Sequence, residues 1–136
     1  MRVFLDTNVL VSAFAARGLC AELFELVLLE HDLILGRSVL QELGKTLEQK
    51  IKLPARDATA IITFLEDEAS RLVETSDPAD VAVDPDDATV LGDAVAGHAE
   101  VFVTGDGKIL RAGQYGSLRI VSPRGFWELL QAEKKP

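Results

Sequence analysis

Four carboxylates in the sequence stand where their side chains could meet and hold a divalent cation. Asp6 and Asp106 each follow a short, strongly apolar run, whereas Glu42 and Asp87 stand near the starts of expected helices. Like charges at close range repel one another unless a cation or a proton offsets them. Mg²⁺ and Mn²⁺ prefer oxygen ligands of this kind. These four side chains are therefore candidates for a metal-dependent site.

Each of the four also has a purely structural interpretation. Asp6 and Asp87 could cap helices, and Glu42 could be a surface acid favoured by the helix dipole. Asp106 could belong to a turn, because it precedes Gly107. Asp6 is hardest to explain in this way, since a charge at the end of a buried strand needs compensation. Joint placement of all four at one edge of a sheet would favour the metal site.

The spacing of apolar residues predicts alternating strands and helices. The expected strands cover residues 3–5, 33–35, 72–73, 101–103 and 118–121. The expected helices cover residues 8–13, 21–30, 38–47, 58–70, 88–98 and 126–131. Ser38 and Gln41 match a capping box, and Pro54 is expected to close that helix. Ser122 and Pro123 are expected at the first positions of the last helix.

Strands separated by helices require crossover connections, so the expected fold is a three-layer α/β domain with a parallel sheet. In such sheets the functional crevice lies outside the carboxyl ends of the strands, where all four acids are expected. The polar stretch 76–87 is expected to be a surface loop. The expected domain covers residues 1–132, and residues 133–136 form a solvated tail.

The composition limits the function classes. The chain has 136 residues, of which 48% are hydrophobic and 26% charged, which is typical of one folded domain. The net charge of -8 argues against a general basic surface for nucleic acid, although bound cations would reverse the local field. The single cysteine, Cys20, excludes an intramolecular disulfide. No apolar run approaches the ~20 residues of a membrane span, so we expect no membrane association and a cytoplasmic location.

Four segments of the sequence resemble the successive motifs of PIN domains, in particular VapC-like toxins of toxin–antitoxin pairs. The segments are MRVFLDTNVLVSA, SVLQEL, DPDDATVLGDAVAGHA and VFVTGDGKIL. The resemblance extends from residue 2 to about residue 130. It implies a central parallel sheet of four to five strands and hydrolysis of RNA with one or two Mg²⁺ or Mn²⁺ ions. It also implies a small antitoxin partner and a homodimer. The expected helix 21–30 is apolar on nearly all sides, which makes Leu28 the candidate contact residue of the dimer.

The same resemblance assigns roles to individual residues. The acids of the family correspond to Asp6, Glu42, Asp87 and Asp106, with Asp86 as a rival for the third position. The chain departs from the family pattern at Ala88, where an Asn is frequent, and at Gly107 and Lys108, where many relatives carry another acid. Four acids rather than five are therefore implied. The positions of Asn8 and Thr104 favour hydrogen bonds from both side chains to these carboxylates. The alternatives are that Asn8 is only a capping residue and that Thr104 is an ordinary residue at a strand end.

Metal-ion chemistry would explain hydrolysis by such a site: two ions about 3.5–4 Å apart clamp the scissile phosphate. Neither His31 nor His98 stands where a metal-free mechanism would need it, and both are expected to face solvent. Basic residues near the acids offer phosphate contacts, namely Lys45, Lys50, Lys52, Arg56, Lys108 and Arg111.

Two alternatives remain open. A haloacid-dehalogenase-like phosphatase also places an Asp after its first strand, but its motif needs a second acid where this chain has Asn8. A non-catalytic PIN-fold interaction module would keep the architecture without the reaction. The second alternative predicts no metal-dependent cleavage of RNA, which separates it from a nuclease.

Overall fold

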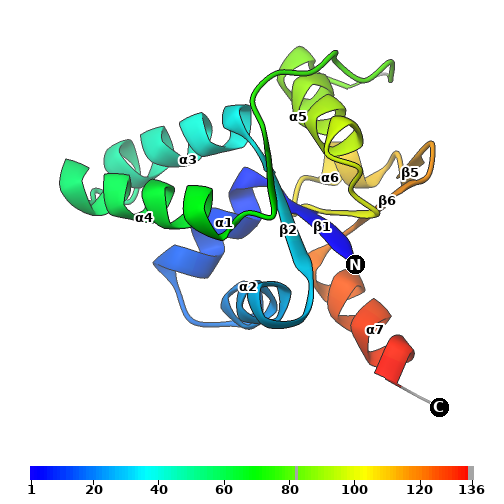
Figure 1. Ribbon diagram of the computed structural model, residues 1–136, viewed down its shortest axis with the longest axis horizontal. Helices are drawn as coiled ribbons and strands as arrows, with labels where there is room; N and C mark the ends of the chain where they lie inside the picture. Colours follow the sequence, from blue (N-terminus) through cyan, green and yellow to red (C-terminus); the bar gives the residue numbers. More distant parts are fainter. Residues whose placement is uncertain (82, 135–136) are drawn as a thin grey trace.

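A computed structural model describes residues 1–81 and 83–134 of the chain (Figure 1). The strands are β1 (Arg2–Leu5), β2 (Asp32–Gly36), β3 (Arg71–Val73), β4 (Val101–Val103), β5 (Gln114–Tyr115) and β6 (Leu118–Val121). The helices are α1 (Thr7–Ala15), α2 (Leu19–Glu30), α3 (Arg37–Gln49), α4 (Ala55–Glu68), α5 (Pro85–Ala96), α6 (Gly107–Leu110) and α7 (Pro123–Lys134).

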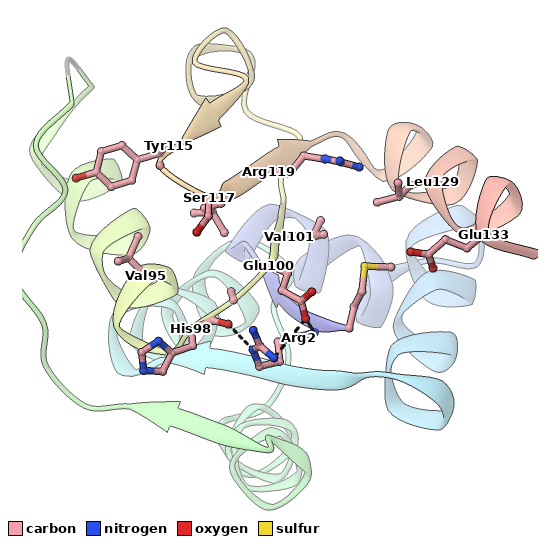
Figure 2. Close-up of a pocket in the computed structure, with 14 residues that line it drawn as sticks. Arg2, Val95, His98, Glu100, Val101, Tyr115, Ser117, Arg119, Leu129 and Glu133 are labelled. Atoms are coloured by element: carbon pink, nitrogen blue, oxygen red, sulfur yellow. Dashed lines mark hydrogen bonds and ion pairs between the residues drawn. The ribbon is translucent and has the colours of Figure 1, made fainter.

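The strands form one sheet in the order β3-β2-β1-β4-β6-β5. Five neighbouring strands are parallel, and only the two-residue β5 runs antiparallel, to β6. Figures 1 and 2 show α5 on one side of the strands and α2 with α7 on the other. The expected three-layer α/β fold with a parallel sheet is therefore confirmed. The short strand β5 and the helix α6 were not predicted, because each has too few residues to show an apolar period.

The central strand β1 is the middle of the core. Val3, Phe4 and Leu5 are all fully buried, as expected for a parallel strand covered on both faces. Phe4 lies between Ile34 of β2 and Phe102 of β4 in the sheet register, and the two phenyl rings stack with centroids 5.3 Å apart. These apolar contacts hold the carboxyl ends of β1 and β4 side by side.

Two expected helix boundaries are wrong. Helix α3 begins at Arg37 with Gly36 at the N-cap, so Ser38 does not cap it and the capping box with Gln41 does not form. The hydroxyl of Ser38 donates instead to Asp93. Pro54 stands at the N-cap of α4 rather than closing α3.

The expected loop 76–87 is also too long at its end. Helix α5 begins at Pro85, because proline supplies the backbone angle of the first helical position without needing a hydrogen-bonded N–H. Asp86 and Asp87 therefore lie in the first helical turn. Residue 82 of this loop lies outside the described residues.

Other expectations about single residues have mixed outcomes. His31 is half-buried, with its Nδ1 3.2 Å from the N-terminal nitrogen and its ring against Phe126, so the expectation that it faces solvent is wrong. His98 is exposed, as expected. Leu28 packs against the core, whereas its neighbour Leu29 is 81% exposed.

The last helix, α7, extends further than expected and ends at Lys134. Residues 133 and 134 of the expected tail belong to α7, and residues 135–136 lie outside the described residues. Across the described ranges, every helix is too short or too polar to cross a bilayer.

The close packing of α5 on the sheet generates a prediction about Gly97. An added Cβ there would lie 2.5 Å from Cγ2 of Ile34 and 3.2 Å from Cγ2 of Val73. We expect Gly97→Ala to lower the free energy of unfolding by about 1–3 kcal/mol through overpacking. The control is Gly107→Ala, where an added Cβ meets no atom within 4 Å. Urea denaturation measures both, and equal stability of the two variants would contradict the prediction.

Candidate functional site

The four candidate acids line one cleft at the carboxyl edge of the sheet. The cleft has a volume of about 530 Å³, and its acidic residues are Asp6, Glu42, Asp84, Asp86, Asp87 and Asp106. Asp6 directly follows β1, and Asp106 stands two residues beyond Thr104 at the end of β4. Glu42 comes from the second turn of α3 and Asp87 from the first turn of α5. The joint placement expected from the sequence is therefore present.

Asp6 is the most buried of these acids, with 6% of its surface exposed. Its Oδ1 accepts a hydrogen bond from the backbone N–H of Thr7 (2.8 Å). Its Oδ2 accepts from the hydroxyl of Thr104 (2.8 Å) and from the side-chain amide of Asn8 (3.2 Å). Asp6 also occupies the N-cap of α1, so the capping role and a place in the cleft are compatible.

Thr104 and Asn8 connect Asp6 to the loop after β4. Oγ1 of the fully buried Thr104 accepts from the backbone N–H of Asp106 at 3.0 Å. Oδ1 of Asn8 accepts from the backbone N–H of Gly105 at 2.7 Å. The two side chains thus fix the positions of Asp6 and Asp106 relative to each other, which is the supporting role expected from the sequence.

Glu42 receives its support from a residue that sequence reasoning missed. The hydroxyl of Thr7 donates to Oε2 of Glu42 at 3.2 Å, which links α1 to α3. Thr46, one turn further along α3, lines the same cleft, as does Lys50, which directly follows the end of that helix. The position of Thr7 directly after Asp6 was the only available signal, and it did not reveal the contact with Glu42 because that contact depends on how α1 and α3 pack.

Asp86 and Asp87 both line the cleft, but they differ in their surroundings. Asp86 is exposed, whereas Asp87 is half-buried. The negative charge of Asp87 is among those that raise the pKa of Asp6, and Asp86 is not. Asp87 is thus the member of the pair whose charge acts on the buried carboxylate of Asp6.

The cleft favours protonation of its buried acids. Burial raises the pKa of Asp6 from 3.8 to about 6, and the charges of Glu42 and Asp87 add to this effect. Hydrogen bonds from Thr104 and Thr7 act in the opposite direction. Burial also raises the pKa of Asp87, with further contributions from Asp106 and Asp84.

The donor set of the cleft suits a hard divalent ion. All its acidic ligand atoms are carboxylate oxygens, the type that Mg²⁺ and Mn²⁺ prefer, and their mutual repulsion would be relieved by a cation. Among residues 1–81 and 83–134, no three His, Cys, Asp or Glu side chains are already close enough to share one ion. The type of donor atom in the cleft therefore suits a divalent ion. Among the described residues, the side chains are not yet arranged as ligands around one point.

A larger hollow, of about 830 Å³, lies at the opposite edge of the sheet and does not contain these acids (Figure 2). Its prominent charges are partly compensated: Arg2 contacts Glu100 at 3.5 Å and donates to the backbone carbonyl of His98. The acidic cleft, although smaller, is the place where uncompensated charge and buried polar groups coincide. We therefore treat it as the candidate site.

The raised pKa of Asp6 predicts that this residue destabilises the chain at neutral pH. An acid whose pKa is higher in the folded state stabilises the fold only while it is protonated, and that contribution is lost as the pH rises through about 6. We therefore expect Asp6→Asn to raise the free energy of unfolding by up to about 3 kcal/mol at pH 8 without divalent ions. The gain should shrink as the pH falls from 6 to 4.

Thermal melts across this pH range, with EDTA present, measure the effect. Asp67→Asn is the matched control, because Asp67 is an exposed acid of α4 outside the cleft. A lower melting temperature of Asp6→Asn than of the unchanged chain at pH 8 would show that Asp6 serves the fold.

Comparisons with known proteins agree with this architecture. No curated protein matches the sequence significantly. The solved structures of VapBC2 from Rickettsia felis bound to a promoter DNA fragment and of VapBC-1 from nontypeable Haemophilus influenzae share the fold. The first has a TM-score of 0.64 at 15% identity, covering 90% of this chain and 98% of the other. The second has a TM-score of 0.63 at 17% identity, covering 91% and 99%.

A third structure, Mycobacterium tuberculosis VapC20, is described as a toxin that cleaves the sarcin–ricin loop. It has a TM-score of 0.62 at 16% identity, covering 86% of this chain and 98% of the other. At such identities these likenesses concern the fold. The sequence itself matches the PIN domain family over residues 2–108, which include all the acids of the cleft. The chain therefore belongs to the PIN domain family.

Proposed function

We propose that this PIN-domain protein is a metal-dependent endoribonuclease and the toxin of a toxin–antitoxin pair. The observation that carries the proposal is the convergence of six carboxylates on one cleft, around the buried Asp6. Solved relatives of the same fold include a toxin that cleaves an RNA loop and VapBC complexes. A protein of this family with an intact acidic cleft has the groups that phosphodiester hydrolysis requires.

In this proposal Asp6, Glu42, Asp87 and Asp106 hold one or two Mg²⁺ or Mn²⁺ ions, and Asp86 is the alternative third acid. When bound, such ions lower the pKa of a water molecule and neutralise charge on the phosphate and the leaving oxygen. The reaction would leave a 5′-phosphate and a 3′-hydroxyl end. The contribution of the chain is to orient these carboxylates toward the same cleft.

The supporting side chains have separate tasks. Thr104 and Asn8 direct Oδ2 of Asp6, and their other bonds hold the loop that carries Asp106. Thr7 directs Glu42 through its hydroxyl. Lys50 lines the cleft and is placed to contact a phosphate of the RNA backbone.

The contacts of Asn8 disfavour the phosphatase alternative. A haloacid-dehalogenase-like mechanism needs a general acid at this position. Asn8 has an amide side chain, which accepts from Gly105 and donates to Asp6, and an amide N–H is not acidic enough to protonate a leaving group. The non-catalytic alternative differs from the nuclease in predicting no metal-dependent cleavage of RNA.

The partners follow from the same proposal. The solved structures of VapBC2 and VapBC-1 share the fold of this chain, which supports a small antitoxin as its partner. A basic antitoxin segment would be attracted to the acidic cleft and would block it. A homodimer and a cytoplasmic location remain part of the proposal, and Leu29 replaces Leu28 as the exposed apolar contact for a second copy.

The nuclease proposal predicts metal-dependent cleavage that requires Glu42. We expect Mn²⁺ to support cleavage of RNA, EDTA to abolish it, and Glu42→Gln to reduce kcat/KM at least about 100-fold, because several kcal/mol of charge stabilisation depend on the ions. Glu48→Gln is the matched control, since Glu48 is an exposed acid of the same helix outside the cleft. Absence of cleavage by the unchanged chain across a set of structured and unstructured RNAs would favour the non-catalytic module.

The acidic balance predicts that RNA binding depends on divalent ions. With a net charge of -8, the chain repels phosphates until cations occupy the cleft. We expect the RNA affinity of Glu42→Gln, measured by fluorescence anisotropy at fixed ionic strength, to increase at least about tenfold when Mg²⁺ replaces part of the NaCl. Tight binding in EDTA would instead require a basic surface elsewhere on the molecule.

A further inference from the structure

A buried carboxylate in α5 has no place in the reaction proposed above. Asp93 is 3% exposed, and it takes part in none of the ion pairs found among the described residues. Two serine hydroxyls donate to it instead: Ser38 to Oδ2 and Ser76 to Oδ1, each at 2.6 Å. Hydrogen bonds to a carboxylate at this length are among the strong ones in proteins.

The bond from Ser38 to Asp93 joins the helices that carry Glu42 and Asp87. Ser38 lies in the first turn of α3, four residues before Glu42 and therefore on the same side of that helix. Asp93 itself lies six residues after Asp87 in α5. Ser76 belongs to the segment after β3. The bond between Ser38 and Asp93 is thus a direct polar link between α3 and α5.

The Asp93 carboxylate packs directly against the backbone of Gly36. A Cβ added to Gly36 would overlap the Asp93 carboxylate, and one added to Gly92 would overlap the backbone carbonyl of Asp77. Gly36 is also the N-cap of α3, which has no side-chain cap of its own. A carboxylate beside this helix start is favoured by the helix dipole. Asp93 therefore fills a notch that only a glycine at position 36 leaves open.

We propose that Asp93 is a positioning residue that, through Ser38, holds α3 and α5 so that Glu42 and Asp87 face the same divalent ion. The inference rests on the nuclease function proposed above. Glu42 and Asp87 have no shared backbone element, so their separation depends on how the two helices pack. Removing the Asp93 carboxylate would leave two unpaired serines and a cavity at this junction, and the helices would lose their fixed spacing.

A purely structural Asp93 would behave differently from a positioning one. In that case its loss would lower stability without changing the affinity of the folded chain for a metal ion. The decisive measurement is therefore Mn²⁺ affinity in the absence of RNA, from the electron paramagnetic resonance signal of free Mn²⁺. It is made well below the melting temperature of every variant compared.

We expect Asp93→Ala to weaken Mn²⁺ binding about tenfold, the effect typical of residues that orient metal ligands. Leu130→Ala is the matched control, because Leu130 is buried in α7, away from α3 and α5, and its loss destabilises the core without touching the acids. Asp93→Asn should keep most of the affinity, since an amide can accept from one serine and donate to the other.

Single serine variants keep the proposal testable if Asp93→Ala does not fold. Ser38→Ala removes the link to α3 and should weaken Mn²⁺ binding more than Ser76→Ala does. An unchanged affinity in folded Asp93→Ala, or in Ser38→Ala, overturns the positioning role while leaving the nuclease function intact. If the unchanged chain binds no Mn²⁺ and cleaves no RNA, both proposals fail together.

Discussion

The need to stabilise one buried charge organises the whole site. Asp6 directly follows the central strand, and its carboxylate is almost completely removed from water. The ionised form of a buried acid is costly unless donors surround it. Thr7, Asn8 and Thr104 provide them, and they come from the start of α1 and from the end of β4. Satisfying a single carboxylate therefore fixes two loops that are almost a hundred residues apart in the sequence.

The other acids approach this centre with much less compensation. Glu42 accepts a hydrogen bond from Thr7, and Asp84 pairs with Lys108 at 3.3 Å, but negative charge still exceeds positive charge around the cleft. This excess adds, through Glu42 and Asp87, to the effect of burial, which is the main cause of the raised pKa of Asp6. It also makes one surface attractive to three kinds of positive group: divalent ions, lysines near a substrate and basic segments of a partner protein.

The sequence predicts the parts of this structure that depend on local patterns. Apolar runs such as Val101–Val103 define the parallel strands, and the positions of Asp6 and Asp106 after them place both acids at one edge. Contacts between helices could not be predicted in this way. Ser38 matches a capping signal, yet its hydroxyl bonds to Asp93 of a distant helix, because packing brings a stronger acceptor to it than the backbone offers.

The two outermost strands of the sheet limit how this protein can associate with others. These strands are β3, with three residues, and β5, with two. Such short strands leave few free backbone N–H and C=O groups, so they are poor templates for an added strand from another chain. Recognition between this chain and a second protein would therefore depend on side chains presented by helices and loops. Affinity and specificity could then change through surface substitutions while the sheet stays the same.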